Sequence, residues 1–232
     1  MDSMSEEIIE LRNVTFGYSP DQPIFRNMDW TVCAGERVGL LGPNASGKST
    51  LLHILMGLRR IQSGEVNLYG RPRLEERDFR EVRSRMGLMF QDSDDQLFCP
   101  TVLDDVAFGP LHLGATPAEA ESAAIEALEL VGLQGYEERI THRLSAGEKQ
   151  CVALATNLAM RPDTLLLDEP TSCLDKSSRA RVLDVLAQLP CTLVIVSHDP
   201  DFIKALATTR YELRDGRLEQ AVRDTQFYAR NF

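Results

Sequence analysis

The chain has 232 residues, with 25 Lys and Arg against 35 Asp and Glu, which gives a formal net charge of −10. This acidic balance disfavours a broad nucleic-acid-binding surface. Five cysteines without a C-x-x-C pair indicate free thiols in a reducing cytosol rather than a zinc site. The sequence has no signal-peptide core and no apolar run as long as a membrane span. Any action at a membrane is therefore expected to need another subunit that crosses it.

The spacing of apolar residues predicts strands along most of the chain. Alternation of apolar and polar residues predicts an antiparallel sheet near the N-terminus, and short apolar runs predict buried parallel strands further on. The expected strands are residues 8–18, 27–32, 38–41, 64–70, 85–90, 164–170 and 191–198, followed by a hairpin that turns at Asp215 and Gly216. The charged residues 71–84 predict an exposed loop and a short helix.

Residues 92–160 have a helical composition. Thr116 precedes a proline and acidic residues, which is typical of a capped helix, and this helix is expected to run to Gly132. Another helix is expected to begin just after Gly147 and to run to Met160. Because a strand, a helix over 177–189 and a strand follow, we predict an α/β core that carries an inserted helical subdomain.

The stretch from Gly42 to Ser49 fits the pattern G-x-x-x-x-G-K-[ST], between an apolar strand and a helix. Gly42 and Gly47 allow the backbone to turn so that successive N–H groups form an anion nest. Lys48 supplies a positive charge for the β- and γ-phosphates, and the Ser49 hydroxyl is suited to Mg²⁺. This stretch therefore predicts a nucleotide-binding site.

Polar residues that suit phosphoryl transfer follow two later strands. Asp168 and Glu169 end one strand and His198 ends another, and ligands bind at the carboxyl ends of parallel strands. We expect Asp168 and Gln91 to ligate Mg²⁺ with Ser49, Glu169 to act as general base toward water, and His198 to bond the γ-phosphate. Such residues can otherwise serve as helix caps or core residues. The preceding phosphate loop favours the catalytic interpretation.

In this order the motifs resemble those of the ATP-binding subunits of ABC transporters, over nearly the whole chain. The motifs are the phosphate loop Gly42 to Thr50, Gln91, the signature Leu144-Ser-Ala-Gly-Glu148, the strand Leu165 to Glu169, the segment Ser172-Cys-Leu-Asp175, and His198. The resemblance implies a P-loop NTPase (RecA-like) α/β core with an N-terminal antiparallel β subdomain and an inserted α-helical subdomain. It implies a single domain over 1–232, with the core at 1–91 and 161–232 and the helical subdomain at 92–160.

The resemblance also implies ATP hydrolysis with Mg²⁺ by two chains arranged head to tail, each ATP lying between the phosphate loop of one chain and the signature of the other. The implied catalytic residues are Lys48, Gln91, Glu169 and His198, and the implied Mg²⁺ ligands are Ser49, Gln91 and Asp168. The implied nucleotide-binding residues are Tyr18, Gly42, Pro43, Asn44, Ala45, Ser46, Gly47, Lys48, Ser49, Thr50, Ser145, Ala146, Gly147, Glu148 and Asp175.

Tyr18 has two interpretations. From the residue alone a half-buried tyrosine of its own sheet is expected, whereas the resemblance implies a ring that stacks on adenine. The signature also departs from the family at Ala146, where glycine is usual, and at Glu148, where glutamine is usual. Cys151 replaces an arginine that often follows. None of these departures removes the expected contact of Ser145 or Gly147.

Residues 90–114 are similar to the energy-coupling-factor transporters, particularly their cobalt and nickel uptake ATPases, in which a short helix after the glutamine docks on a membrane coupling subunit. Leu97 and Phe98 offer an apolar knob, and Asp94 and Asp95 suit arginines of a partner. An acidic solvated loop is the alternative. The short C-terminus fits the metal-uptake type with a homodimer of ATPases.

The sequence therefore predicts the ATPase subunit of a cobalt or nickel importer, peripheral on the cytoplasmic face of the membrane. Its expected partners are a second copy of itself, a coupling subunit and a substrate-binding membrane subunit, and no nucleic acid. An importer for a vitamin or another solute is an alternative, and so is a soluble ABC ATPase of DNA repair or translation.

Overall fold

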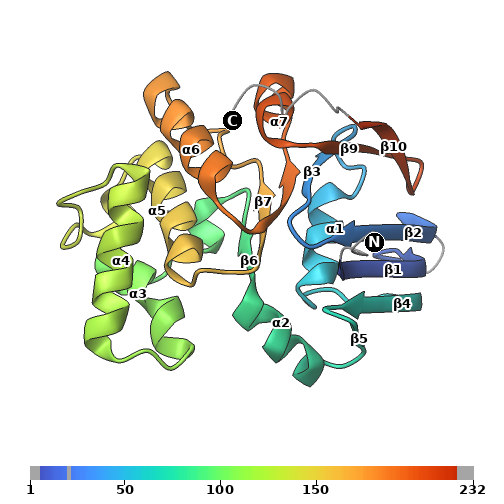
Figure 1. The fold of residues 1–232 in the computed structure, drawn as a ribbon, viewed down its shortest axis with the longest axis horizontal. Helices are drawn as coiled ribbons and strands as arrows, with labels where there is room; N and C mark the ends of the chain where they lie inside the picture. Colours follow the sequence, from blue (N-terminus) through green and yellow to red (C-terminus); the bar gives the residue numbers. More distant parts are fainter. Residues whose placement is uncertain (1–5, 20–21, 224–232) are drawn as a thin grey trace, which may run out of the picture. The chain divides into compact units, whose positions relative to one another are not determined.

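The computed structural model describes residues 6–19 and 22–223. The chain forms two compact units, one within residues 1–86 and 191–232 and the other from Gly87 to Pro190 (Figure 1). The expected lack of a signal core concerns mainly residues 1–5, which lie outside the described residues. Within the described ranges, the helices are too short or too polar to cross a bilayer.

An antiparallel sheet forms the N-terminal part of the first unit, as predicted. Its strands lie in the order β2-β1-β4-β5. They are β1 (Glu7–Phe16), β2 (Phe25–Cys33), β4 (Ser63–Leu68) and the short β5 (Arg71–Pro72). Burial alternates along β2 from Met28 to Val32, which agrees with the period of two, whereas β1 departs from it at residues 8–9 and 12–13, where its pairing with β2 is irregular.

A second group of strands in the first unit is mainly parallel. Strand β3 (Arg37–Leu41) pairs in parallel with both β8 (Thr192–Val196) and β9 (Thr209–Arg214), and β9 continues into β10 (Arg217–Arg223) through the predicted hairpin. Asp215 and Gly216 at the turn have φ values of 49° and 76°, as a type I′ turn requires. The predicted α/β class is confirmed.

Helices complete the first unit. They are α1 (Lys48–Leu55), the 3₁₀ turn η1 (Glu76–Asp78), α2 (Phe79–Arg85) and α7 (Pro200–Leu206). The charged segment 71–84 contains the expected short helix, but it is not wholly exposed. The Arg73 guanidinium is buried because it donates to the carbonyls of Leu68 and Asp78 and to the Glu81 carboxylate.

The second unit is mostly helical. Its elements are β6 (Met86–Met89, whose first residue belongs to the other unit), η2 (Ser93–Asp95), α3 (Val102–His112), α4 (Pro117–Val131), η3 (Thr141–Arg143), α5 (Ala146–Ala159), β7 (Thr164–Asp168) and α6 (Lys176–Gln188). Helices α3, α4 and α5 pack against one another. Helix α4 has the predicted Thr116 cap and ends at Gly132.

Helix α5 begins earlier than predicted. Ser145 is its N-cap, so Ala146 and Gly147 form the first turn instead of preceding the helix. The reason is a reciprocal capping box, in which Ser145 and Glu148 each bond the backbone of the other. The signature segment is therefore the start of a helix.

Candidate nucleotide-binding site

The phosphate loop lies in the first unit, between β3 and α1. Its glycines are required both by conformation and by space. Gly42 and Gly47 have φ values of 145° and 104°, which other residues rarely adopt. A Cβ at Gly42 would lie 2.5 Å from the carbonyl oxygen of Leu213, and one at Gly47 would lie 2.6 Å from Ile24 Cγ2. The loop thus packs against β9 and the start of β2 with backbone alone.

Two polar side chains of this loop suit an anionic ligand. Lys48 is buried, and its ammonium donates to the carbonyl oxygens of Gly42 and Pro43, each at 2.9 Å. The Ser46 hydroxyl is also buried, and no hydrogen-bond partner for it occurs among the described residues. A fixed cation and an unbonded buried hydroxyl at the start of a helix fit the phosphates of a nucleotide.

The outer side of the phosphate loop borders an open, polar hollow of about 770 Å³. Pro43 to Ser46 line one side of it, and its charged lining residues are Arg26, Arg214 and Arg217 together with Asp215 and Glu219. Arg214 is also paired with the Glu212 carboxylate at 2.7 Å, so the hollow is mixed in charge with only a small positive excess.

Tyr18 is exposed to 63%, so the interpretation as a half-buried residue of the sheet is wrong. Its hydroxyl lies 3.0 Å from Thr50 Oγ1 on α1, and its ring contacts Phe16 edge-on at 5.2 Å. The Arg59 guanidinium lies 5.6 Å from the ring centroid. The tyrosine is therefore fixed close to the phosphate loop with much of its ring open to solvent.

His198 is exposed two residues beyond the end of β8. In the parallel register Leu40 of β3 pairs with Val196 of β8. Gly42 lies two positions after Leu40, and His198 lies two positions after Val196. Both residues therefore follow their strands at the same carboxyl edge of the sheet. The expectation that strand ends bring these two motifs together is met within the first unit.

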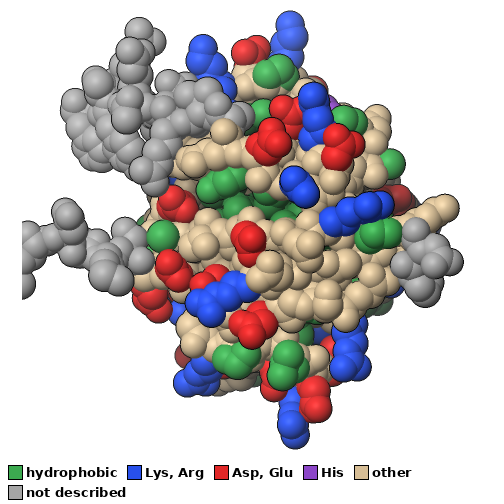
Figure 2. All heavy atoms as spheres, turned by 90° about the vertical axis from the view of Figure 1, so that its right-hand side faces the viewer, with side chains coloured by type: hydrophobic (Ala, Val, Ile, Leu, Met, Phe, Trp, Pro, Cys, Tyr) green, Lys and Arg blue, Asp and Glu red, His purple; other side chains and the backbone are tan. Residues whose placement is uncertain are grey.

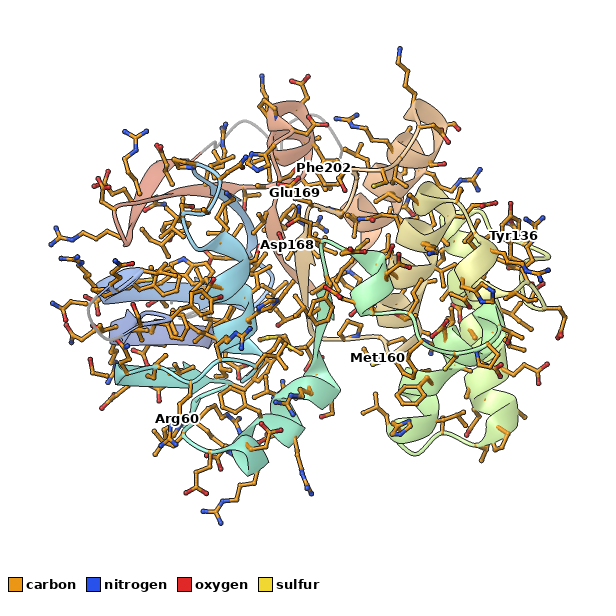
Figure 3. All side chains as sticks on the ribbon, turned by 180° about the vertical axis from the view of Figure 1, so that it is seen from behind. Arg60, Tyr136, Met160, Asp168, Glu169 and Phe202 are labelled. Carbon is orange, nitrogen blue, oxygen red and sulfur yellow. The ribbon has the colours of Figure 1, made fainter. Side chains whose placement is uncertain are left out.

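The predicted carboxylates lie in the second unit, where Asp168 is the last residue of β7 and Glu169 follows it (Figure 3). Asp168 is 3% exposed. Glu169 has a φ of 50°, which is unusual for a residue with a side chain. Its carbonyl accepts hydrogen bonds from Ser172 N at 3.2 Å and from Gln150 Nε2 at 3.0 Å. These two bonds hold the Glu169 backbone in place.

Gln150 was not singled out by the sequence analysis. It is a polar residue that is 2% exposed, on the same helix as the signature. Its position among apolar residues of α5 is the signal that could have found it.

The signature approaches the segment 172–175 within the second unit. A Cβ at Gly147 would lie 3.0 Å from the Cys173 carbonyl oxygen. Asp175 caps α6, and its carboxylate accepts hydrogen bonds from the backbone and hydroxyl groups of Ser177 and Ser178. These bonds hold the pKa of Asp175 well below its usual range. The capping function is observed directly, whereas the nucleotide contact of Asp175 stays a prediction.

Gln91 is exposed, two residues beyond the end of β6 at Met89. The segment that follows it is fastened to α5 by Gln96, a residue that the sequence analysis did not identify. Its Nε2 donates to the Ala153 carbonyl at 2.8 Å and to Thr156 Oγ1 at 2.7 Å, while its Oε1 accepts from Phe90 N. The segment after Gln91 is therefore attached to α5, while its Asp92, Asp94 and Asp95 side chains are exposed.

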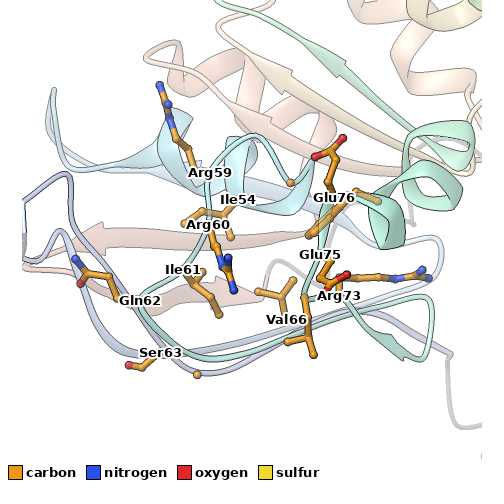
Figure 4. Close-up of a pocket in the computed structure, with 14 residues that line it drawn as sticks. Ile54, Arg59, Arg60, Ile61, Gln62, Ser63, Val66, Arg73, Glu75 and Glu76 are labelled. Carbon is orange, nitrogen blue, oxygen red and sulfur yellow. The ribbon is translucent and has the colours of Figure 1, made fainter.

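A cavity of about 670 Å³ lies elsewhere in the first unit, between the end of α1, strand β4 and the segment before α2 (Figure 4). Arg59, Arg60 and Glu76 are among its lining residues, and none of the predicted motif residues contributes to it. Figure 2 shows acidic and basic side chains interspersed over the face formed by the right-hand side of Figure 1. The drawn side chains on that face form no continuous basic surface for a polyanion.

Comparisons with known proteins agree with this geometry. The family model described as ABC transporter matches residues 25–172. The energy-coupling factor transporter ATP-binding protein EcfA of Methanocaldococcus jannaschii is 40% identical over 91% of this chain and 77% of its own length.

Two solved structures are also similar. One is cbiO1 from Clostridium perfringens, described as part of the ABC transporter complex cbiONQ (TM-score 0.82, 29% identity, 97% of this chain and 92% of that chain). The other is the ATP-binding cassette MJ0796, a dimer in a post-hydrolysis state bound to ADP and Pi (TM-score 0.86, 26% identity, 94% and 99%). The P-loop NTPase fold is thereby confirmed. The chain belongs to the ABC transporter ATP-binding proteins, ATPases that couple ATP hydrolysis to transport.

Proposed function

We propose that this chain energises a membrane importer for cobalt or nickel ions, as a head-to-tail dimer on the cytoplasmic face of the membrane. The observation that carries the link to a membrane partner is an ordered apolar surface beside Gln91. Phe98 is 68% exposed, and its ring packs edge-on against that of Phe108 on α3, with 4.8 Å between the ring centroids. The ring of Phe108 also packs against that of His112, with 3.9 Å between the ring centroids. We call Phe98, Phe108 and His112 the aromatic row.

Hydrogen bonds to the buried Asp105 fix the backbone at Phe98, the first residue of the aromatic row. Asp105 is buried, and one of its carboxylate oxygens accepts from the backbone N–H groups of Phe98 and Cys99, at 3.0 and 2.9 Å. Because these bonds fix the backbone, Phe98 stays exposed without being free to fold back. An exposed, rigid aromatic residue is typical of a binding hot spot. The partner is proposed to be the coupling subunit, next to a substrate-binding membrane subunit.

The hydrolytic chemistry is proposed to follow the roles expected from the sequence. Lys48 neutralises charge on the β- and γ-phosphates, Glu169 accepts a proton from the attacking water, and His198 donates to the γ-phosphate. Ordering of the Glu169 backbone by Gln150 supports its role as base, since a general base has to be positioned before its pKa matters. Tyr18 stacks on adenine, which its exposed ring supports.

Mg²⁺ is proposed to be held by Ser49, Gln91 and Asp168, a set of hard oxygen donors that suits this ion. When bound, the ion would neutralise charge on the phosphate oxygens. The position of Asp168 supports this assignment, because it is the last residue of β7 and ligands bind at the carboxyl ends of such strands.

Dimerisation is proposed to place Ser145 to Glu148 of one chain against the ATP of the other. The dimeric MJ0796 cassette supports a dimer of this kind. The helical start of α5 supports the contact, because Ser145, Ala146 and Gly147 surround the positive end of a helix. The domain is proposed to comprise a core at 1–91 and 161–232 with a helical subdomain at 92–160.

The cargo proposal rests on the resemblance of residues 90–114 to cobalt and nickel uptake ATPases, together with the likeness to cbiO1. An importer for a vitamin or another solute is a second candidate, because the EcfA relative is described only as an energy-coupling factor protein.

The test replaces the gene in the source cells by one that encodes the Phe98→Ser variant. It measures the fraction of the chain that is bound to the membrane and the accumulation of radioactive cobalt and nickel in the cells. We expect the membrane-bound fraction to fall roughly tenfold or more, as for loss of a hot-spot residue, and metal accumulation to fall with it. Leu130→Ser is the matched control, since Leu130 is an exposed leucine of the same unit. Glu169→Gln should abolish accumulation while the chain stays on the membrane.

Two results would contradict the proposal in different ways. An unchanged membrane-bound fraction of Phe98→Ser would refute docking through the aromatic row. Cobalt and nickel accumulation that is normal in the Glu169→Gln cells would refute the metal cargo and favour the importer of another solute.

A further inference from the structure

Glu148 is one of the two signature residues that depart from the family, and its carboxylate is fully engaged within the second unit. One oxygen, Oε2, accepts from Ser145 N at 2.8 Å and from Ser145 Oγ at 2.7 Å. The other oxygen, Oε1, accepts from the Tyr136 hydroxyl at 2.7 Å and lies 3.6 Å from Arg139 Nη1. Glu148 thus connects the start of α5 to the loop before it.

These bonds use both donors of Ser145. The serine has one backbone N–H and one hydroxyl proton, and Glu148 accepts each of them. The serine oxygen accepts from Glu148 N at 3.3 Å. A phosphate oxygen would need the same donors, because an oxyanion accepts hydrogen bonds and cannot donate them. The Glu148 carboxylate is therefore bound where an anionic ligand of Ser145 would have to bind.

Tyr136 and Arg139 balance the charge of this carboxylate. The Arg139 guanidinium lies 3.5 Å from the centroid of the Tyr136 ring, and both face the same oxygen of Glu148. The pKa of Glu148 is lowered, mainly by the bonds from Ser145 and then by Tyr136, while the pKa of Tyr136 is raised by the same carboxylate. The group is thus a carboxylate, with the tyrosine as donor.

We propose that Glu148 is a positioning residue. Its carboxylate binds the two donors of Ser145 until the γ-phosphate of the ATP bound to the second copy displaces it, and Tyr136 and Arg139 then hold the displaced carboxylate. The inference rests on the proposed contact between the signature and the ATP of a second copy. On binding, Ser145 exchanges Glu148 Oε2 for a phosphate oxygen, and Oε1 keeps its bonds to Tyr136 and Arg139. The strength of the Ser145–Glu148 bonds then sets the ATP concentration that closes the dimer.

This exchange predicts opposite effects for two neighbouring substitutions. In Glu148→Gln the acceptor is neutral and holds Ser145 less strongly, and a negative charge beside the phosphate is removed. In Tyr136→Phe the carboxylate loses a donor on its far oxygen, so it keeps Ser145 more strongly. A role confined to capping the helix would instead make both variants less stable and change their ATP dependence alike.

The experiment measures the KM for ATP and kcat of hydrolysis, using the complex isolated from source membranes. We expect Glu148→Gln to lower KM roughly threefold to tenfold and Tyr136→Phe to raise it roughly threefold, each with a smaller change in kcat. In the double variant the Tyr136 effect should vanish, because the tyrosine acts through the carboxylate. Arg139→Gln should resemble Tyr136→Phe, and Arg139→Lys should restore part of the loss.

Glu119→Gln is the matched control, because Glu119 closes an equivalent capping box on α4. It should leave KM unchanged. Shifts of the same sign in Glu148→Gln and Tyr136→Phe, or no shift in either, would overturn the positioning role. Ser145→Ala separates this outcome from failure of the proposed function: if it too leaves KM unchanged, the signature does not contact ATP at all.

Discussion

Helices α4 and α5 begin with nearly the same structure but in different surroundings. In α4, Glu119 Oε2 accepts from Thr116 N at 2.8 Å and from Thr116 Oγ1 at 2.7 Å. In α5, Glu148 accepts from Ser145 at the same two distances. Among the described residues Glu119 has no further hydrogen-bond or ion-pair partner, whereas Glu148 also contacts Tyr136 and Arg139.

The exchange proposed at Ser145 would give a standard helix start a second use. Both boxes satisfy free N–H groups of a first turn, and each would stabilise its helix without any further role. What distinguishes α5 is that its acidic residue has charge-balancing partners on the far side and that its second helical residue is a glycine against Cys173. Function therefore depends on the surroundings of the motif more than on the motif itself.

The largest expected difference between the two caps comes from removing the hydroxyl. Ser145→Ala and Thr116→Ala should each lower stability by about 1 kcal/mol through loss of the cap. Ser145→Ala should in addition lower kcat/KM for ATP roughly tenfold to a hundredfold, because a charge-assisted bond to phosphate is lost. Thermal unfolding and steady-state kinetics of both variants provide the measurement. Equal kinetic losses would remove the distinction between the two helices.

A smaller effect is expected at the second helical position, which is Gly147 in α5 and Ala118 in α4. Gly147→Ala should lower turnover roughly threefold to tenfold, since the new Cβ would lie 3.0 Å from the Cys173 carbonyl and displace the segment 172–175. Ala118→Gly should cost about 0.5–1 kcal/mol of stability and leave turnover unchanged. Normal turnover in Gly147→Ala would show that this close approach has no catalytic importance.

The smallest effect concerns acid, where the two caps should behave alike. The pKa of Glu119 is lowered by its bonds from Thr116, and that of Glu148 mainly by its bonds from Ser145. A lowered pKa means that each box stabilises the fold above the usual pKa of glutamate and loses this effect as the pH falls through the folded-state pKa. Between pH 6 and pH 3 the melting temperature of each Glu→Gln variant should therefore fall less than that of the wild type, because the variant has no such effect to lose. A difference limited to one box would contradict this equivalence.

Much of the site was predictable from local sequence. The phosphate loop, the strand ends at Asp168 and His198, and the Thr116 cap depend on short patterns whose geometry the backbone imposes directly. The pattern S-x-x-E at Ser145 is equally visible, but the glycine favours a helix that starts only after Gly147. A glycine is unfavourable in a helix, but here the reciprocal cap and the close contact with Cys173 outweigh that cost. Helix α7 was missed although Asp199 and Pro200 are a regular cap and first residue.

Other parts of the site depend on tertiary contacts that no local pattern encodes. Tyr136 and Arg139 come from the loop between α4 and α5, and their contact with Glu148 arises only when that loop folds back on α5. The same holds for Gln96 and Gln150, polar residues whose partners are 57 and 19 positions away in the sequence. The exposed ring of Tyr18 could be predicted only through the family resemblance.

The bond from Gln150 to the Glu169 carbonyl has a mechanical consequence. Ser145 and Gln150 are joined by less than two turns of α5, about 7 Å along the helix axis. In the proposed dimer, the Ser145 end of this helical segment contacts the nucleotide bound to the partner. The Gln150 end holds the backbone of Glu169, the proposed base for the nucleotide bound to the same chain. In that arrangement a small movement of α5 would reach both nucleotides, so the state of one site would be transmitted to the other through a single short helix.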